Sequence, residues 1–200
     1  MSFEKRVELI ERRGVYRGHF HVDVLRLRHS LYRGGMGTEI RREILNRGHA
    51  VAVLPYDPVR DEVVLVEQFR IAPYDTGDDA WMLEVIAGLI EDGEDLDSVA
   101  RREAQEESGL RLDRVDEIMT IYTSPGAISE RITLYHAPVD SSLAGGIHGV
   151  AEEGEDIRVV VMPYGEAMTA LNGGQITSGP TVVALQWLAL NRDRLRGSAS

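Results

Sequence analysis

Two continuous apolar runs near the middle of the chain predict the centre of the fold. Residues 49–56 and 62–70 are rich in Val, Leu and Ala, and each run has the length of a strand. Asp57-Pro-Val-Arg-Asp61 separates them and is a strong turn sequence. We therefore expect a buried hairpin here, followed by a short strand at residues 83–87 that leads into a glycine turn at Gly88.

The N-terminal region shows a weaker, alternating pattern. Residues 20–28 and 38–47 alternate roughly between apolar and polar positions, and Gly34-Gly-Met-Gly37 lies between them as a turn. These stretches predict antiparallel strands, but they carry few large apolar residues. We expect residues 1–47 to form a small antiparallel β subdomain that packs either on the main domain, residues 48–200, or on a second subunit.

The remainder of the chain mixes strand and helix patterns. Strand-like stretches occur at residues 115–123, 130–137 and 157–162, and helices are expected at 163–171 and 181–194. Residues 140–156 form a Gly-rich, acidic connection that is too long for a simple turn, and loops of that kind are often functional. The order of elements predicts an α/β (α+β) fold, in which helices lie outside a mixed sheet.

One predicted helix, residues 97–108, is crowded with carboxylates. Its apolar face is made of Leu96, Val99, Ala100 and Ala104. Gly109 is placed to end the helix. Glu103, Glu106 and Glu107 project from neighbouring positions, where like charges oppose helix formation by roughly a few tenths of a kcal/mol per pair. A divalent cation would reverse this repulsion, and a donor set of oxygens alone favours Mg²⁺ or Mn²⁺ over Zn²⁺.

Composition narrows the possible function classes. The chain has 200 residues, 43% of them hydrophobic, which is enough for a core. Its formal net charge of −11 argues against a nucleic-acid partner, because binding to phosphate backbones relies on Lys and Arg. The absence of Cys excludes disulfides, thiol catalysis and Cys-based zinc sites. The charged N-terminus has no apolar run of signal or membrane-spanning length, so we expect a cytoplasmic protein with no membrane partner.

The glycine turn and the acidic helix together match a known motif. The stretch reads Gly88, five residues, Glu94, seven residues, Arg102-Glu103, an apolar residue, any residue, Glu106-Glu107, any residue, Gly109 and an apolar residue. It resembles the Nudix box at every specified position, the apolar ones included. The alternative is an exposed acidic helix that is merely solvated, and the repulsion between like charges argues against it.

Similarity to the ADP-ribose pyrophosphatase branch of the Nudix hydrolases extends from about Tyr16 to Leu190. It is carried by Glu67-Gln-Phe-Arg70, Asp75-Thr, Trp81, Leu83-Glu-Val-Ile-Ala-Gly88, Ser124-Pro-Gly126, Gly146 to Arg158 and Ala184-Leu-Gln-Trp-Leu188. Pro125 lies fifteen residues after Leu110, where a proline marks the ADP-ribose enzymes of that branch, although Ser-Pro-Gly is also an ordinary tight turn. The resemblance implies a Nudix α/β/α sandwich and a homodimer with exchanged N-terminal strands. It also implies Mg²⁺-dependent hydrolysis of ADP-ribose to AMP and ribose 5-phosphate.

The resemblance further implies roles for the residues of the box. Metal coordination falls to Glu103, Glu107 and the backbone carbonyl of Ala87. Glu106 is either another metal ligand or a residue that contacts the ligands without touching the metal. Arg102 orients the glutamates by ion pairing.

In the branch that the sequence resembles, the general base comes from outside the box. The resemblance places it at Glu153 in the acidic loop, with Glu155 as a further metal ligand. The residues alone leave open which of Glu152, Glu153 and Glu155 points inward, or whether this turn is simply solvated.

Substrate contacts are implied at several positions. Arg70 ends a strand near the box and could hold a phosphate in two bonds, or could be a surface charge. The other implied contacts are Glu130 for the terminal ribose, Arg42, His19 and Phe20 for adenine, and Leu89 and Ser124 beside the box and the proline. His19 stands where the family often has an aromatic residue, and Phe20 could equally be a core residue of a strand.

Two other functions are consistent with the sequence. One is a pyrophosphatase for another nucleoside diphosphate sugar, such as a GDP- or UDP-sugar. The other is a non-catalytic module that binds ADP-ribose to regulate a partner, but such modules usually have a degraded box, whereas all three glutamates are present here.

Overall fold

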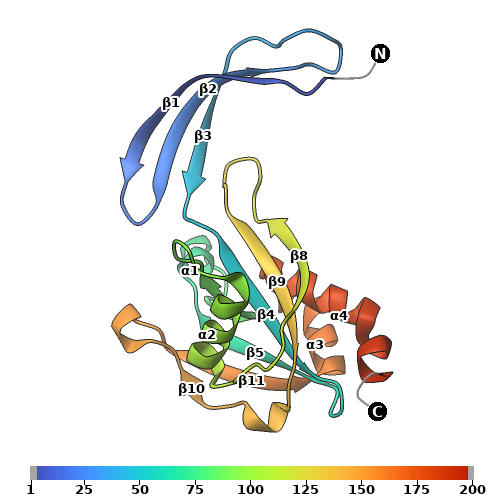
Figure 1. Cartoon of the computed structure of the whole chain (residues 1–200). Helices are drawn as coiled ribbons and strands as arrows, with labels where there is room; N and C mark the ends of the chain where they lie inside the picture. Colours follow the sequence, from blue (N-terminus) through green and yellow to red (C-terminus); the bar gives the residue numbers. More distant parts are fainter. Residues whose placement is uncertain (1–3, 198–200) are drawn as a thin grey trace. The chain divides into compact units, whose positions relative to one another are not determined.

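The computed structural model describes residues 4–197, apart from the side chain of Glu153, and these form two compact units. One unit is residues 4–48 with 122–131, and the other is residues 49–121 with 132–197. Figure 1 shows the elements of both.

The first unit is a three-stranded antiparallel sheet in the order β1 (Val7–Arg17), β2 (His21–His29) and β3 (Ile40–Asn46). The alternating pattern predicted β2 and β3, but it did not resolve β1 as a strand of its own. Leu9 lies opposite Leu27, and Leu27 lies opposite Ile40, so these apolar side chains share one face. Every residue of β1 is exposed in the single chain, and Val24 is the only buried apolar residue in the three described strands, so this sheet has almost no hydrophobic core of its own.

Residues 122–131 pair with the end of β3. The Leu45 N–H donates to the Ala127 carbonyl at 2.8 Å, and the Ser129 N–H donates to the Leu45 carbonyl at 3.0 Å. The Ser124 carbonyl accepts the N–H groups of Ala127 and Ile128, which closes the Ser-Pro-Gly segment into a tight turn.

The second unit is built on a mixed sheet in the order β10-β11-β5-β4-β9-β8, with β6 paired to β5 and β7 paired to β4. Its strands are β4 (Ala50–Asp57), β5 (Glu62–Phe69), β6 (Trp81–Glu84), β7 (Ile86–Leu89), β8 (Asp116–Tyr122), β9 (Arg131–Pro138), β10 (Ile147–His148) and β11 (Ile157–Pro163). Strands β4 and β9 run parallel, whereas β5 runs antiparallel to both β4 and β11.

The predicted hairpin is present at its turn, where Tyr56 pairs with Val63 and Asp57 pairs with Glu62. Away from the turn, β4 pairs with β7 and β5 pairs with β6. The single strand predicted at residues 83–87 is therefore wrong in detail, because the segment divides between two neighbours. The break falls at Val85, whose N–H donates to Thr181 Oγ1 at 2.9 Å instead of to a strand.

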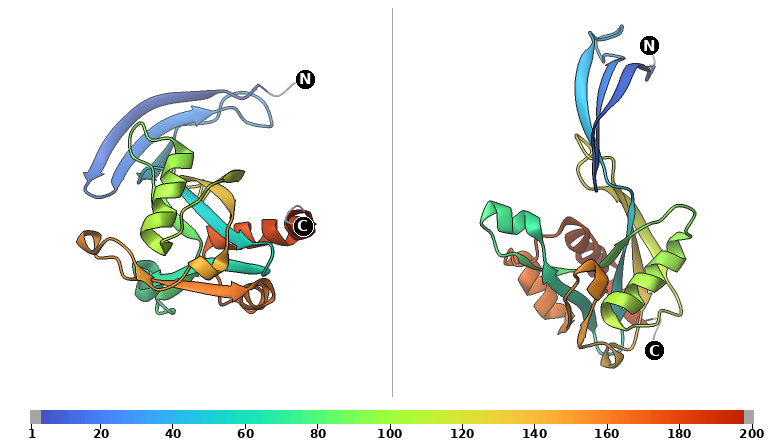
Figure 2. Two further views of the ribbon diagram at one scale, coloured as in Figure 1. Left: turned by 60° about the horizontal axis from the view of Figure 1, so that its bottom comes forward. Right: turned by 90° about the vertical axis from the view of Figure 1, so that its left-hand side faces the viewer.

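Helices cover both faces of this sheet, as the right-hand view of Figure 2 shows. These helices are α2 (Leu96–Ser108), α3 (Tyr164–Asn172) and α4 (Gly179–Gly197), whereas the short helix α1 (Ile71–Thr76) buries none of its residues. Alternate residues of β4 and β5 enter two separate cores. Val51, Val53, Val64 and Val66 pack with the apolar face of α2. Ala52, Leu54, Val63 and Leu65 pack with α3 and α4.

The α/β/α arrangement confirms the predicted fold class, and α2 begins and ends within one residue of its predicted bounds. Helix α1 was not predicted, because its six residues include Pro73 and run into the polar stretch 75–79, a pattern typical of a loop. The long acidic connection contains η1 (Ser141–Leu143), β10 and η2 (Ala151–Glu153). None of the described helices combines the length and the apolar character needed to cross a bilayer.

Candidate active site

Helix α2 presents two glutamates towards the sheet. Asp95 caps its N-terminus by accepting a hydrogen bond from the Ser98 N–H at 3.1 Å, and Gly109 ends it in the left-handed conformation. Because Val99, Ala100 and Ala104 are buried against the sheet, the neighbouring turns of the same helix bury Glu103 and Glu107 to 9% and 3% exposure.

Strand β7 lies directly against these carboxylates. The Ala87 N–H donates to Glu107 Oε2 at 3.1 Å. A Cβ atom at Gly88 would overlap the Glu103 carboxylate, so any other residue at this position would displace that side chain. Strand β7 and helix α2 thus bring Ala87, Glu103 and Glu107 close together.

Arg102 lies among the acidic groups, as predicted. Its guanidinium is 2.8 Å from Glu103, 3.2 Å from Glu106 and 3.3 Å from Glu94. Glu106 is turned outward and half-exposed, which distinguishes it from the two buried glutamates. Arg102 thus fixes the orientation of one buried carboxylate and one surface carboxylate together.

Burial raises the pKa of Glu107 to about 8, and the hydrogen bond from Ala87 opposes this shift. The negative charges of Glu103 and Glu155 raise the pKa of Glu107 further, whereas Arg70 lowers it. Burial also raises the pKa of Glu103, against the nearby charge of Arg102. Glu103, Glu107 and Glu155 thus interact electrostatically with one another, and a cation at this place would relieve their repulsion.

The acidic loop reaches α2 through its backbone. The Gly149 N–H donates to the Glu106 carbonyl at 3.2 Å, and Glu155 Oε2 accepts the Val150 N–H at 3.0 Å. The side chain of Glu153, the predicted general base, lies outside the described residues. Among the side chains that are described, no three acidic or imidazole groups converge closely enough to form a ready-made metal cage.

Arg70 lies close enough to the carboxylates to influence Glu107, and it is anchored by Glu84 through a contact of 2.6 Å. The sequence did not reveal Glu84 as this partner. The two residues are 14 apart: Arg70 directly follows β5 and Glu84 ends β6, which pairs with β5, and no spacing rule predicts that contact.

The other residues predicted to contact the substrate are found in both units. Leu89 belongs to β7, and its carbonyl accepts a hydrogen bond of 3.5 Å from Arg102. Glu130 is buried in the first unit and paired with Arg47 at 3.2 Å, a contact that no pattern in the sequence predicted. Also in the first unit are Ser124, Arg42, which is exposed, and His19 and Phe20, whose rings lie 4.9 Å apart edge to face.

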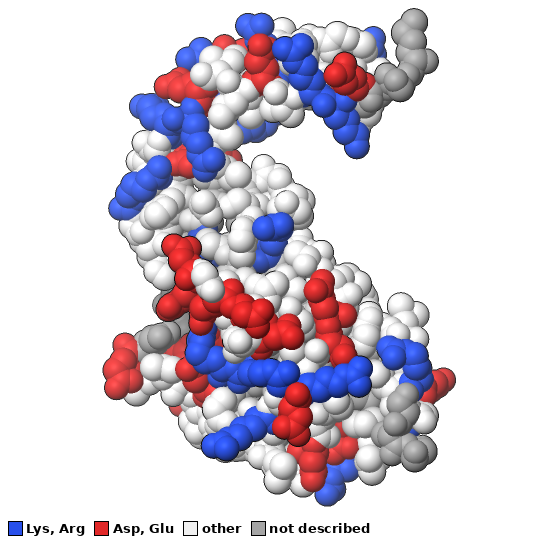
Figure 3. Space-filling model, in the orientation of Figure 1, with Lys and Arg blue, Asp and Glu red and all other residues white. Residues whose placement is uncertain are grey.

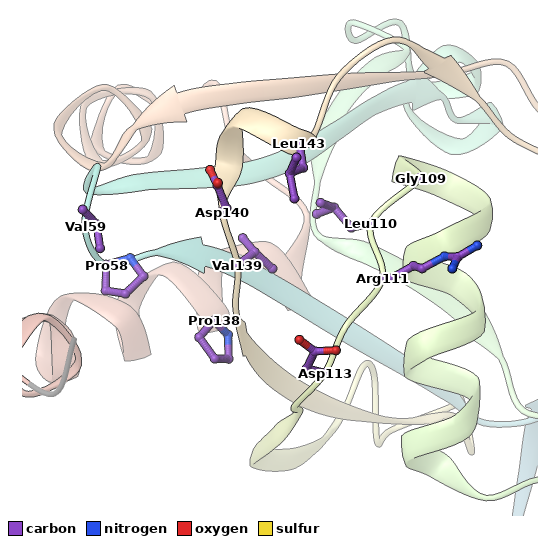
Figure 4. Close-up of a pocket in the computed structure, with 10 residues that line it drawn as sticks. All are labelled: Pro58, Val59, Gly109, Leu110, Arg111, Asp113, Pro138, Val139, Asp140 and Leu143. Atoms are coloured by element: carbon purple, nitrogen blue, oxygen red, sulfur yellow. The ribbon is translucent and has the colours of Figure 1, made fainter.

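A separate open hollow of about 560 Å³ lies beyond the C-terminal end of α2 (Figure 4). Three segments line it, and the residues that they contribute are Pro58, Val59, Gly109, Leu110, Arg111, Asp113, Pro138, Val139, Asp140 and Leu143. None of the predicted catalytic, metal-binding or substrate-binding residues lines it, so it is distinct from the carboxylate site.

Comparisons with known proteins find relatives in both sequence and fold. The model of the NUDIX domain family matches residues 46–184. ADP-ribose pyrophosphatase of Escherichia coli strain K12 is 50% identical over 190 residues, which is 95% of this chain and 91% of that protein. The ADP-ribose pyrophosphatase of Haemophilus influenzae is 42% identical, with 96% and 90% covered, and the GDP-mannose pyrophosphatase of Cronobacter sakazakii is 38% identical, with 75% and 78% covered. A crystal structure of an ADP compounds hydrolase has the same fold, with a TM-score of 0.72 at 21% identity over 99% of this chain and 98% of that one.

Proposed function

Because the chain belongs to the Nudix family, we propose that it is a hydrolase that cleaves the pyrophosphate bond of ADP-ribose to give AMP and ribose 5-phosphate. The observation that carries the choice of substrate is the similarity to named ADP-ribose pyrophosphatases over 95% of the chain. The complete carboxylate array on α2 supports catalysis rather than binding alone. The absence of Cys is compatible with a reducing compartment, and we place the reaction in the cytoplasm.

The donor set fits a hard divalent cation. Glu103, Glu107 and the Ala87 carbonyl offer oxygen atoms from two adjoining elements, and Glu155 adds a further carboxylate whose charge reaches both glutamates. We assign Mg²⁺ to these residues, with Mn²⁺ as a substitute of the same ligand preference. A bound divalent cation screens the charge of the pyrophosphate and lowers the pKa of a coordinated water.

The chain's own residues orient the reactants. Arg102 holds Glu103 in place, and Arg70 is anchored by Glu84. We assign Arg70 to a phosphate oxygen of the substrate. Glu153 is the proposed general base, and Glu106 supports the ligands from the solvent side through Arg102.

We assign Glu130 to the terminal ribose and Arg42, His19 and Phe20 to the adenine. Ser124 and Leu89 are proposed as further substrate contacts. We also propose a homodimer, because the sheet of the first unit has almost no core in the single chain and exposes the apolar face of β1.

A product assay tests this assignment. Purified protein with Mg²⁺ is expected to release AMP from ADP-ribose, while GDP-mannose and UDP-glucose react more slowly. Faster cleavage of GDP-mannose would favour the second candidate, a GDP-sugar pyrophosphatase, which is supported by the similarity to the Cronobacter sakazakii enzyme.

The Glu107→Gln variant separates the enzyme from a regulator that only binds ADP-ribose. It is expected to lose turnover by orders of magnitude while it still binds ADP-ribose. An unchanged rate would refute the assignment of Glu107 to the metal.

A further inference from the structure

Three consecutive residues of the acidic loop, His148, Gly149 and Val150, connect the end of α2 with Glu155. His148 is half-buried and lies in β10. Its Nε2–H donates to the Gly145 carbonyl at 2.8 Å, and its ring covers Gly109, where a Cβ atom would lie 2.9 Å from Cε1. The imidazole therefore holds the start of the loop against the last turn of the helix that carries the glutamates.

Gly149 continues this connection. Its N–H donates to the Glu106 carbonyl at 3.2 Å, one of the orphan carbonyls at the end of α2. Its φ of 105° is a conformation that favours glycine, and a Cβ atom here would lie 2.8 Å from the Cβ of Glu155. Gly149 thus touches the helix on one side and the backbone of Glu155 on the other.

Val150 completes the connection. Its N–H donates to Glu155 Oε2 at 3.0 Å, which fixes the direction of that carboxylate within the loop. The charge of Glu155 acts on both Glu103 and Glu107, so the carboxylate lies on the side of the loop that faces the site.

From these contacts we propose that His148 is a positioning residue, which sets the place of Glu155 relative to Glu103 and Glu107 through Gly149 and Val150. The inference rests on the proposed role of Glu155 as a metal ligand. The hydrogen bond of His148 goes to the Gly145 carbonyl and to none of these three carboxylates, so it acts through the loop. A histidine that merely fills a surface depression would leave Glu155 and the Gly149 hydrogen bond unaffected when it is replaced.

The variants His148→Ala and His148→Gln test this inference in the full-length protein. Alanine removes both the ring contact and the donor, whereas the glutamine amide can reach the Gly145 carbonyl as a donor in place of Nε2. Ile147→Ala is the matched control, because its exposed side chain precedes His148 in the same strand.

The first measurement is amide hydrogen exchange without metal or substrate. Gly149 and Val150 are expected to exchange faster in His148→Ala, and the glutamine variant is expected to restore slow exchange at both. The control and the thermal transition of the whole protein should match the wild type. Unchanged exchange of both amides in His148→Ala would overturn the proposal.

The second measurement is Mn²⁺ binding without substrate, followed by electron paramagnetic resonance of the free ion. His148→Ala is expected to bind Mn²⁺ about tenfold more weakly, the loss typical of a group that orients a ligand, and kcat should fall by a larger factor than KM changes. The Glu107→Gln variant distinguishes failure of the positioning role from failure of the metal site itself. If it loses Mn²⁺ affinity while His148→Ala does not, the positioning role is wrong and the metal site stands. If neither loses affinity, the metal site itself is wrong, and the role of His148 falls with it.

Discussion

At Gly88 the absence of a side chain allows the Glu103 carboxylate to lie against β7. We predict that Gly88→Ala displaces Glu103, because the new methyl group would occupy the space of the carboxylate. Displacement of an active-site group by about 1 Å can cost on the order of 100-fold in catalytic efficiency. Steady-state kcat/KM with ADP-ribose, at saturating Mg²⁺, measures this loss.

The control for that substitution is Gly165→Ala in helix α3, where an added Cβ meets no atom within 4 Å. Alanine also favours helix formation relative to glycine, so this control should keep full activity and lose no stability. If Gly88→Ala retained wild-type kcat/KM, the close approach of β7 to Glu103 would not matter for the reaction.

His136 makes the stability of the protein depend on pH. Burial lowers its pKa to about 4, and neither ring nitrogen has a hydrogen-bond partner among the described residues. Asp116, the nearest carboxylate, is 3.8 Å away and only partly opposes the shift. Below pH 6.5 the unfolded chain binds a proton at this histidine that the folded chain does not. The free energy of unfolding should therefore fall by about 3 kcal/mol between pH 6.5 and pH 4 from this residue alone.

The variant His136→Phe tests that contribution, because phenylalanine keeps the contacts with Trp187 and Tyr56 and has no titrating group. Urea unfolding at pH 7 and at pH 4.5 should show that the wild type loses more stability than the variant over this interval. Replacement of the exposed His21 by Asn should leave the difference between the two pH values as it is in the wild type. Parallel losses in wild type and His136→Phe would contradict the prediction.

Among the elements, the break between β6 and β7 depends on helix α4. The Val85 N–H donates to the hydroxyl of Thr181 instead of to a neighbouring strand, and Thr181 is fully buried. We predict that Thr181→Val costs about 1–3 kcal/mol, since the side chain keeps its shape but leaves a buried donor without a partner. Urea unfolding of the variant measures this cost.

Thr181→Ser is the matched variant, because it keeps the hydroxyl and loses only a methyl group. It should be more stable than Thr181→Val if the hydrogen bond is the important contribution. The reverse order would indicate that packing of the methyl group, and not the bond to Val85, holds α4 against the strand break.

The same break shows why part of the fold could not be predicted from the sequence. The continuous apolar runs of β4 and β5 follow from burial on both faces, and the Nudix box follows from local spacing, so both were predictable. The division of residues 81–89 between β5 and β4 depends on which strand has a free edge, and no local pattern records that. For the same reason, the contacts Arg70–Glu84 and Arg47–Glu130 appeared only with the tertiary structure.

Over the whole molecule, charge is distributed unevenly. Residues 1–48 contain 11 of the 22 Lys and Arg but only 6 of the 33 Asp and Glu, so the remaining residues contain 11 basic and 27 acidic side chains. Figure 3 shows basic side chains over the sheet of the first unit and many acidic ones over the second. A basic sheet with an exposed apolar face can pack on an acidic second copy by charge as well as by hydrophobic contact.

This distribution gives a prediction for the proposed homodimer. Leu9 is 56% exposed on the face that it shares with Leu27 and Ile40, whereas its neighbour Glu8 pairs with Arg28 on the opposite face. Leu9→Asp places a charge on the apolar face and should shift the protein towards monomer in sedimentation velocity experiments. It should also weaken ADP-ribose binding if residues of a second copy complete the adenine site. Glu8→Ser changes the other face and should leave the protein dimeric, and a wild-type protein that is monomeric at micromolar concentration would refute the dimer itself.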